Sequence, residues 1–370
     1  MKLIILRSNL KDGLSALERA VVDNANLPIL KNIVLKADTR VTLQATNLEI
    51  GITYQTNAKI NEPGALTIPF APLQSIIQNS TSERIVLDAS GNTLTVKTDN
   101  YEAKIQGLAV EDFPIIPKLD AETQSLEMTC GVFKNAMVQI SGAAATNDLK
   151  PELNSVLIDF QSGSLKCAAT DGFRLAEKNF PQNTFASTSP DIIKALVPLK
   201  TIQEVIRMFP DDEQLTLTFD DNQVLFSAKD VSLISRLIDG SYPDYAAIIP
   251  KQVATELTLE REQLASAIKL VSNFSGKASD VRLKIAESGA ELEVFASNQL
   301  VGENEYKVPI KKQKGEAVKE IIFNWRYLLE GIRSLPGPAI TIGLNGEGKP
   351  VVIKPTDDDS VFYIVMPIQN

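Results

Sequence analysis

Histidine, the commonest general base and metal ligand in proteins, is missing from this sequence of 370 residues. Its absence removes the Ser-His and Cys-His pairs that activate nucleophiles. The two cysteines, Cys130 and Cys167, are 37 positions apart and neither has another cysteine nearby. The sequence therefore offers no zinc cluster and no disulfide framework. We expect two buried thiols, no cofactor and no metal.

Carboxylates are the remaining candidates for catalysis, since the chain has 46 acidic residues. The acidic runs Asp211-Asp212, Asp220-Asp221 and Asp357-Asp358-Asp359 all stand in polar, turn-like contexts. Solvated loops explain them better than paired catalytic acids do. The segment Gly343–Lys349 has the glycine and lysine spacing of a phosphate-binding loop, but Pro350 replaces the required Ser or Thr and a strand-like run follows. We predict a hairpin turn there.

The composition is that of a globular protein, with 44% hydrophobic and 22% charged residues. A chain of this length exceeds what one hydrophobic core usually organises, so we expect more than one domain. No apolar run approaches the roughly 20 residues that span a membrane. The first residues, Met1–Arg7, are too briefly hydrophobic for a signal peptide. We expect a cytoplasmic protein with no membrane association.

Internal repetition organises the chain, because three landmarks recur in one order after 124 to 129 positions. The landmarks are an Ala-[Thr/Ser]-[Asn/Asp] turn, the end of an apolar strand before a helix, and a hydrophobic-Pro closure. In that order, the landmarks of the first repeat are at Ala45, Pro69 and Phe113, those of the second at Ala169, Pro198 and Tyr242, and those of the third at Ala296, Asn324 and Met366. We therefore predict three repeats, with residues 1–120, 121–250 and 251–370 forming the first, second and third.

Each repeat is predicted to contain two helices and a set of antiparallel strands. The opening helices have apolar residues three and four apart, at Leu10, Leu14, Leu17 and Val21, at Phe133, Met137 and Ile140, and at Leu264, Ile268 and Val271. The second helices begin near Pro72, Leu199 and Asn324, and alternating or wholly apolar strands lie between and after the helices. The predicted fold is α+β, with three similar domains in series.

The distribution of charge argues against an ordinary nucleic-acid-binding protein. Lys+Arg and Asp+Glu number 12 and 13 in the first repeat, 10 and 17 in the second, and 15 and 16 in the third. No repeat has the basic excess that phosphate binding usually needs. The net charge of each repeat does not show where its basic residues lie. They recur on the predicted helices, at Lys11, Arg19, Lys134, Lys200, Arg207, Lys269, Arg326 and Arg333. Each can be an ordinary solvated side chain, but together they can form a basic surface.

Two further segments indicate a binding surface for a partner. Residues 169–175 join a turn to an aromatic residue, Phe173, that is expected to be exposed. The chain also stays apolar almost to its end, and Met366, Pro367 and Ile368 lie beyond what the final strand needs. An exposed apolar edge of this kind usually contacts a partner.

The segments Leu27–Asn32, Ala169–Ala176, Asp239–Tyr245 and Tyr363–Ile368 resemble the bacterial DNA polymerase III beta subunit family, the sliding clamps. The resemblance covers the full length and the three-repeat plan. It implies a head-to-tail homodimer closed into a ring that encircles double-stranded DNA without sequence preference. It also implies a processivity factor in DNA replication with no catalysis of its own. Net charge of −9 suits such a ring if its basic residues face inward.

The resemblance further implies a groove for short hydrophobic peptides of the DNA polymerase III alpha subunit, the clamp loader, other polymerases and repair factors. By position the groove comprises Leu153, Thr170, Gly172, Arg174, Leu175, Pro243, Ile248, Asn324, Tyr327, Pro350, Ile364, Val365, Met366, Pro367 and Ile368. The residues expected to face DNA are Lys11, Lys134, Lys200, Arg207, Arg326 and Arg333.

This sequence departs from the family pattern at several of these positions. Phe173 stands where histidine is common, Ala247 replaces a basic residue, and Gln369-Asn370 replaces a more hydrophobic and basic ending. Asn24 and Ala71-Pro72 replace basic residues on the DNA side, which predicts a weaker DNA contact by the first repeat.

Two other functions remain open at the level of sequence. One is a carboxylate-dependent hydrolase or metal enzyme on a repeated α+β scaffold, which the missing histidine disfavours. The other is a structural ring that no longer binds DNA. Retention on circular but not linear DNA distinguishes a clamp from both.

Overall fold

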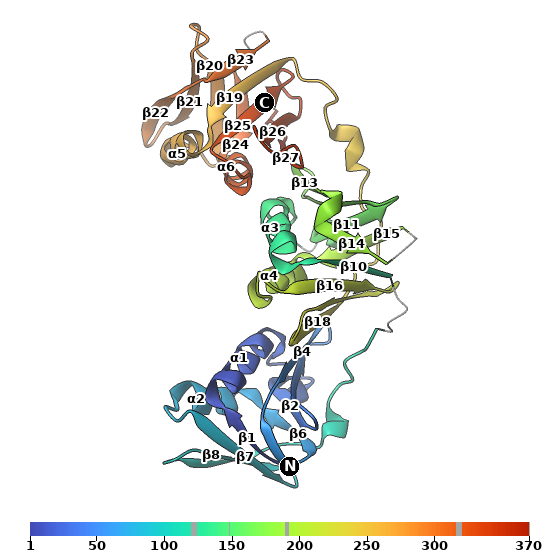
Figure 1. The fold of residues 1–370 in the computed structure, drawn as a ribbon. Helices are drawn as coiled ribbons and strands as arrows, with labels where there is room; N and C mark the ends of the chain where they lie inside the picture. The colour runs from blue at the N-terminus through green and yellow to red at the C-terminus, as the bar shows by residue number, and fades with distance from the viewer. Residues whose placement is uncertain (120–123, 148, 189–191, 316–319, 370) are drawn as a thin grey trace. The chain divides into compact units, whose positions relative to one another are not determined.

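The computed structural model describes residues 1–119, 124–147, 149–188, 192–315 and 320–369 (Figure 1). The expected boundary between residues 120 and 121 lies outside these ranges, as does Asn370. The chain forms two compact units. One contains Met1–Gly131, Ala186–Ser189 and Gln203–Leu237, and the other contains Val132–Phe185, Pro190–Ile202 and Ile238–Asn370. The division passes through the second repeat.

Each repeat has the same order of elements: one strand, a helix, five strands, a second helix and three strands. In the first repeat the helices are α1 (Arg7–Leu17) and α2 (Phe70–Asn79). Its strands are β1 (Lys2–Leu6), β2 (Asn32–Ala37), β3 (Val41–Thr46), β4 (Ile50–Thr56), β5 (Lys59–Glu62), β6 (Gly64–Pro69), β7 (Arg84–Ser90), β8 (Thr93–Lys97) and β9 (Glu102–Gln106).

In the second repeat the helices are α3 (Cys130–Ile140) and α4 (Leu199–Met208). Its strands are β10 (Gln124–Thr129), β11 (Ser155–Gln161), β12 (Ser164–Thr170), β13 (Arg174–Phe180), β14 (Phe185–Ser187), β15 (Ile193–Pro198), β16 (Gln214–Phe219), β17 (Gln223–Ser227) and β18 (Val231–Arg236).

In the third repeat the helices are α5 (Arg261–Val271) and α6 (Trp325–Ser334). Its strands are β19 (Thr255–Glu260), β20 (Asp280–Ile285), β21 (Glu291–Asn298), β22 (Gly302–Pro309), β23 (Lys312–Lys314), β24 (Ile321–Asn324), β25 (Ala339–Leu344), β26 (Val351–Pro355) and β27 (Val361–Val365). The predicted pair of helices per repeat is confirmed.

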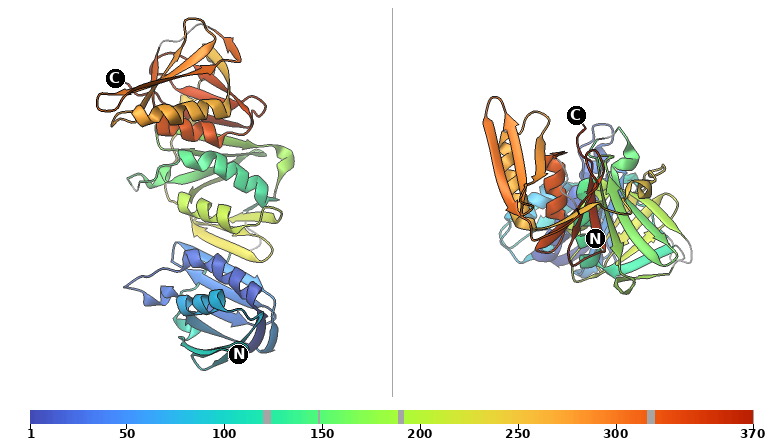
Figure 2. Two further views of the ribbon diagram at one scale, coloured as in Figure 1. Left: turned by 90° about the vertical axis from the view of Figure 1, so that its left-hand side faces the viewer. Right: turned by 90° about the horizontal axis from the view of Figure 1, so that it is seen from above.

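Hydrophobic periodicity explains these elements. On α1 the residues three and four apart, Leu10, Leu14 and Leu17, are all buried, so one face of the helix packs on the sheet beside it. On β16 the inward residues alternate with partly exposed ones, which is the pattern of a strand with a single covered face. Figure 2 shows α1 beside α2 and α5 beside α6, and each of these pairs is in contact.

The described residues form four sheets, and two of these run continuously from one repeat into the next. The first joins the second repeat to the first through β18 and β4, in the order β14-β10-β16-β17-β18-β4-β3-β2-β6. The other joins the third to the second through β27 and β13, in the order β15-β11-β12-β13-β27-β26-β25-β19-β23. The remaining sheets, β5-β1-β7-β8-β9 and β22-β21-β20-β24, each belong to one repeat.

The strand β27 is buried at every position, unlike a strand with one solvated face. Its second face is covered by the segment that connects β18 to β19, because Tyr242 and Tyr245 pack with Phe362 and Ile364 in one apolar cluster. The Tyr245 hydroxyl donates to Glu177 at 2.7 Å. Burial, together with this bond to Glu177, raises the pKa of Tyr245. The connecting segment is therefore part of the core rather than a loose linker.

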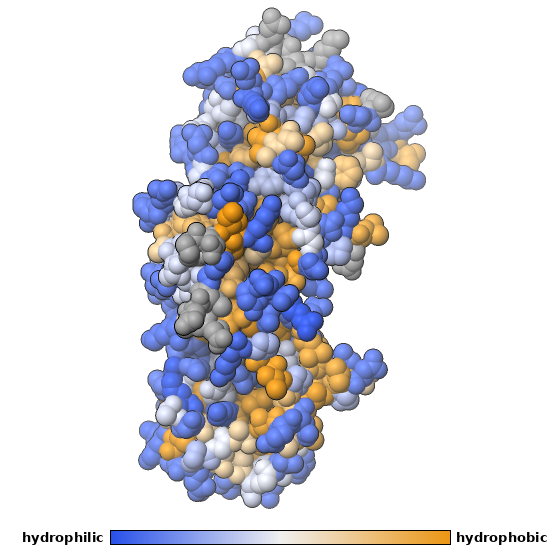
Figure 3. Space-filling model, turned by 90° about the vertical axis from the view of Figure 1, so that its right-hand side faces the viewer, coloured by the Kyte–Doolittle hydropathy of each residue, from blue (hydrophilic) through white to orange (hydrophobic). Residues whose placement is uncertain are grey.

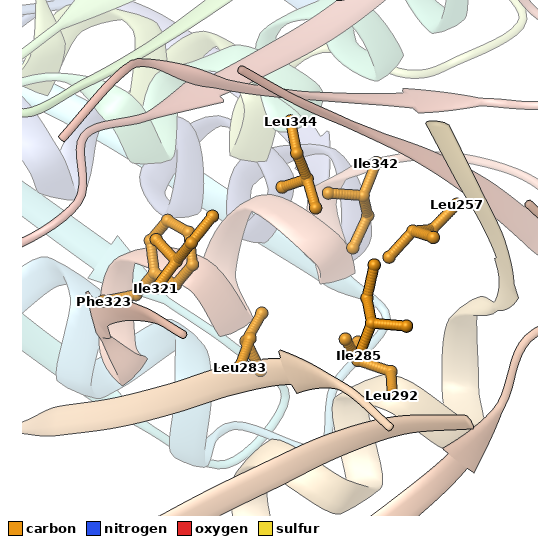
Figure 4. Close-up of a pocket in the computed structure, with 8 residues that line it drawn as sticks. All are labelled: Leu257, Leu283, Ile285, Leu292, Ile321, Phe323, Ile342 and Leu344. Atoms are coloured by element: carbon orange, nitrogen blue, oxygen red, sulfur yellow. The ribbon is translucent and has the colours of Figure 1, made fainter. Parts of the chain in front are cut away.

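The third repeat has an apolar core of its own between its two sheets (Figure 4). Leu283, Ile285, Leu292, Ile321 and Phe323 face a small cavity of about 10 Å³ from one sheet. Leu257, Ile342 and Leu344 face it from the other sheet. A cavity of this size holds at most about one water molecule, and an apolar lining gives that water no hydrogen-bonding partner.

The chemically suggestive segments of the sequence take ordinary structural places. The segment 345–350 connects the antiparallel strands β25 and β26, which confirms the predicted hairpin and rejects the phosphate-binding loop. Both cysteines are buried, as predicted, and burial raises the pKa of Cys167. No group of three or more Cys, Asp or Glu side chains in the described ranges is arranged to bind a metal.

The acidic run at 357–359 differs in part from the prediction of a solvated loop. Asp357 and Asp359 are exposed, but Asp358 is partly buried and accepts hydrogen bonds from the Ser360 amide at 2.8 Å and the Lys178 ammonium at 3.2 Å. The prediction missed this bridge because Lys178 and Asp358 meet only when β13 pairs with β27. Within the described residues, no helix has the length and apolar character needed to cross a membrane.

Candidate functional site

The turn between β12 and β13 is held by its own side chains. Asp171 Oδ1 accepts from the amides of Phe173 at 2.9 Å and Arg174 at 3.0 Å, while the Thr170 hydroxyl donates to the Arg174 carbonyl at 2.6 Å. Gly172 has φ of +90°, a left-handed conformation that glycine adopts without steric cost. The turn leaves the Phe173 side chain 63% exposed, as expected from the sequence.

Arg174 connects this turn to helix α6. Its side chain is 9% exposed, and it donates to Asp171 at 2.9 Å and to Glu330 at 2.6 Å. The guanidinium also lies over the Tyr327 ring, 4.4 Å from its centroid. Burial alone would lower the pKa of Arg174, but Tyr363, Glu330 and Asp171 raise it, so the group stays charged.

The end of the chain lies against the same turn. Strands β13 and β27 pair so that Leu175 is opposite Ile364, and beyond the strand the Met366 amide donates to the Phe173 carbonyl at 2.8 Å. The Ile368 amide donates to the Ile322 carbonyl, also at 2.8 Å. These bonds fix residues 366–368 between the turn and β24. Phe173 itself stacks with Tyr327, with the ring centroids 6.5 Å apart.

The predicted groove residues differ widely in exposure. Four apolar members are buried: Leu153, in a short 3-10 turn, and Leu175, Ile364 and Val365 in the paired strands. Thr170, Arg174 and Pro367 are also buried. The partly exposed members are Asn324 at the N-cap of α6, Tyr327 on α6, Pro350 before β26, Met366 and Ile368, and the exposed members are Gly172, Pro243 and Ile248.

This distribution bears on Leu175 and Ile364, which the resemblance places in the peptide groove. Leu175 and Ile364 are fully buried in the apolar cluster beneath Tyr242 and Tyr245, so neither can contact a peptide unless the cluster opens. The exposed apolar surface at the turn consists instead of Phe173 and the partly exposed Met366, and Ile248 is exposed in the segment that connects β18 to β19. A single sequence does not distinguish a strand residue under a connecting segment from one that faces solvent.

The residues predicted to face DNA all lie on helices: Lys11 on α1, Lys134 on α3, Lys200 and Arg207 on α4, and Arg326 and Arg333 on α6. All of them are exposed except Lys134, which is partly buried. Their ionic surroundings differ. Arg207 donates to Glu204 at 3.0 Å, and Arg19 lies 3.8 Å from the same carboxylate, so this acid partly neutralises both.

Sequence reasoning missed two contributors to these surfaces. Glu330 has no local signal, because its partner Arg174 is 156 positions away in the chain. Trp325 is the single tryptophan, and the cations of Lys269 and Arg326 both lie near its ring. The hydropathy pattern could have placed Trp325 at the start of a helix but not beside a residue of another helix.

Comparison with known proteins decides the family. Models of the DNA polymerase III beta subunit match along nearly the whole chain: the N-terminal domain at residues 1–117, the central domain at 127–244 and the C-terminal domain at 246–369. The chain belongs to the DNA polymerase III beta subunit family. This is a family of non-catalytic processivity clamps, so the chain is a binding protein and not an enzyme.

Individual relatives agree with this assignment. The chain is similar to the beta sliding clamp of Synechococcus elongatus, with 29% identity over all of this chain and 99% of that one. It is 26% identical to the beta sliding clamp of Staphylococcus epidermidis, with both covered completely. Its fold is similar to the DNA polymerase III subunit beta of Pseudomonas aeruginosa, with a TM-score of 0.93, 24% identity and complete coverage of both chains.

Proposed function

We propose that two copies of this chain close head to tail into a ring that encircles double-stranded DNA, slides along it, and tethers polymerases. The observation that carries this proposal is the arrangement of the four sheets. Family membership supports the ring-shaped dimer, and the strand orders of this chain indicate which strands of the two copies pair.

In this dimer, the two sheets confined to single repeats combine: the sheet of the third repeat of one copy joins the sheet of the first repeat of the other copy. Each shared sheet has nine strands, of which five come from one repeat and four from another. The sheet that ends at β9 has five strands, and the sheet that ends at β22 has four. By order along their repeats, β9 corresponds to β18 and β27, and β22 corresponds to β4 and β13. Pairing β22 of one copy with β9 of another completes the pattern.

The same correspondence predicts the register of this intermolecular pair. At the two shared sheets Leu233 is opposite Ile52, and Tyr363 is opposite Ala176. Following the paired residues from strand to strand within each sheet, Ala103 on β9 corresponds to Leu233 and Tyr363, because it is opposite Val96. In the same way Asn304 on β22, opposite Ala296, corresponds to Ile52 and Ala176. Lys104 then faces Glu303 of the second copy. A contact between unlike ends closes after two copies instead of extending into a filament if the rotation fits.

The DNA-facing role is proposed for Lys11, Lys134, Lys200, Arg207, Arg326 and Arg333. All six lie on the helices, and contacts to phosphates carry no sequence information, so the ring can move along the duplex. Encirclement explains how a chain of net charge −9 is retained on a polyanion without a large basic surface.

The partner site is proposed at the surface formed by Phe173, Ile248 and Met366, with Tyr327 beneath Phe173 and with Pro243 and Ile368 at its margin. The partners are the DNA polymerase III alpha subunit, the clamp loader, and other polymerases and repair factors in the cytoplasm. On the one face drawn in Figure 3, apolar side chains occur in separate patches among hydrophilic ones. A surface with only a few exposed apolar side chains, such as Phe173 and Ile248, suits short peptides with one or two apolar anchors.

Retention on DNA tests the clamp function. The protein is assembled with a clamp loader on nicked circular DNA, and retention is measured by gel filtration before and after the circle is cut. We expect the protein to stay on the circle and to leave the linear form. Equal retention on both forms would contradict topological encirclement.

Peptide binding tests the partner site separately. Met366→Asp places a charge on the proposed surface and leaves the buried Pro367 in place, whereas Gln369→Asp is the matched change at an exposed neighbour. Loss of one buried apolar anchor costs about 1.5 to 3 kcal/mol, so affinity for a fluorescent polymerase peptide should fall roughly ten-fold to over a hundred-fold. Equal effects of both variants would place the peptide elsewhere.

A further inference from the structure

The surroundings of Trp325 form a cationic cluster on the third repeat. The Lys269 ammonium on α5 lies 5.4 Å from the centroid of the Trp325 ring, and the Arg326 guanidinium on α6 lies 5.2 Å from it. Helices α5 and α6 are in contact and lie side by side (Figure 2). Two exposed cations from different helices therefore converge on one partly exposed aromatic ring.

These two cations lack the carboxylate partner that Arg207 of helix α4 has. Within the residues that the structure describes, no carboxylate oxygen lies within 4.0 Å of Lys269 or Arg326. The first turn of α6 contains no acidic residue. On α4, by contrast, Arg207 shares Glu204 with Arg19. The positive charge beside Trp325 is thus not offset by a neighbouring carboxylate, whereas that of Arg207 on α4 is.

Comparison between the repeats indicates that this cluster is particular to the third. Counting from the start of the helix in each repeat, Trp325 corresponds to Phe70 and Leu199. Lys269 corresponds in the same way to Ser15 and Val138. The ring offsets only part of the repulsion between two like charges near its centroid, and an anion between them would remove that repulsion.

We propose that Lys269, Trp325 and Arg326 form a site for a backbone phosphate of duplex DNA. The site rests on the proposed clamp function. It adds Lys269 and Trp325 to the DNA-facing residues and ranks Arg326 above Arg207. Arg333, which is seven positions beyond Arg326 on α6, extends the same row of cations, so that it can contact a further phosphate of the same DNA strand.

The sole tryptophan makes the contact directly observable in the full-length dimer. A fluorescein-labelled duplex oligonucleotide is titrated at several salt concentrations, and both duplex anisotropy and Trp325 fluorescence are recorded. We expect the two signals to change together. Each phosphate contact contributes about −0.9 to the slope of log K against log salt, so Lys269→Gln and Arg326→Gln should each make the slope less negative by about one.

A matched variant distinguishes this site from a general loss of charge. Lys284→Gln removes an exposed lysine that is paired with Glu293 on the third repeat. It should leave the slope nearly unchanged. A slope change in this control as large as that of Lys269→Gln would overturn the proposal. So would duplex binding without a Trp325 response, or no duplex binding at low salt.

Retention on circular DNA tests the ring independently of the phosphate site. If the unmodified protein is retained on nicked circular DNA but the salt slopes do not depend on Lys269 and Arg326, the phosphate site is wrong and the clamp function stands. If the unmodified protein is not retained on the circle, the clamp function itself fails. Trp325→Leu, which introduces the residue of the second repeat, should weaken duplex binding less than Arg326→Gln does.

Discussion

Arg174 is the residue through which the β12–β13 turn is fixed to helix α6, and its removal should be costly. Arg174→Ala would leave the Asp171 carboxylate, 11% exposed, without its cation. Breaking a buried pair by removing one partner costs about 3 to 5 kcal/mol. We expect a loss of that size in the free energy of unfolding of the unit that contains residues 132–185, measured by chemical denaturation.

Glu330→Gln is the control for this variant. Glu330 is 48% exposed, and an exposed ion pair contributes only about 0 to 1 kcal/mol. The glutamine keeps an oxygen that can accept from Arg174. A loss from Glu330→Gln as large as that from Arg174→Ala would mean that the buried Asp171 is not the cause.

The Asp358 carboxylate should make stability depend on pH. Burial disfavours its charged form, but hydrogen bonds from Ser360 and the ammonium of Lys178 outweigh this and lower its pKa in the folded protein. A group with a depressed folded pKa stabilises the protein above its unfolded pKa, about 4, and loses this contribution as the pH falls through the folded value. Asp358→Asn should therefore be destabilising at pH 7 and much less so near pH 3.

Asp357→Asn, at the exposed neighbouring position, should change stability little at either pH. Thermal melting at both pH values measures the two variants. A destabilisation by Asp358→Asn that stays constant from pH 7 to pH 3 would mean that the ionised carboxylate is not what stabilises the β13–β27 contact.

At the scale of elements, the sequence was sufficient to predict a helix, strand or turn wherever the pattern depends only on neighbouring residues. The spacing of Leu10, Leu14 and Leu17 defines α1, and the strand-like residues after Pro350 exclude a phosphate-binding loop, because both follow from neighbours in the chain. The burial of Leu175 was not predictable in this way. It depends on a segment about 70 positions later, where Tyr242 and Tyr245 cover the strand.

The apolar core between the sheets of the third repeat should be sensitive to truncation. Ile342 is 2% exposed and lines the cavity with Phe323 and Leu257, so Ile342→Ala enlarges a space that water does not stabilise. Substitutions of this type cost about 2 to 5 kcal/mol. Leu149→Ala, at a position that is 87% exposed, should change stability by less than about 0.5 kcal/mol. Chemical denaturation measures both, and equal small effects would mean that the core collapses around the alanine.

At the scale of the whole molecule, the three-repeat plan followed from the spacing of landmarks, while the ring followed only from resemblance. No sequence pattern reveals which strand edges of different repeats pair, because β4 and β18 are separated by more than one full repeat. Once the orders of the sheets are known, the unpaired edges at β9 and β22 are the natural contact between copies. The charged residues on these edge strands are consistent with this, since most positions of β9 and β22 are exposed or partly exposed.

The proposed register makes the dimer sensitive to the charges of one residue pair. Lys104→Glu or Glu303→Lys alone would place like charges opposite each other, and each substitution acts at both contacts of a closed dimer. Cross-strand pairs contribute about 0.2 to 1 kcal/mol, so either change should weaken dimerisation by up to about ten-fold to thirty-fold. Combining both restores opposite charges and should recover most of the affinity in sedimentation equilibrium. Glu287→Lys, the same charge change at an exposed turn of the third repeat, controls for net charge. If the double variant dissociates more readily than either single variant, Lys104 and Glu303 are not opposite each other and the intermolecular strands pair in another register.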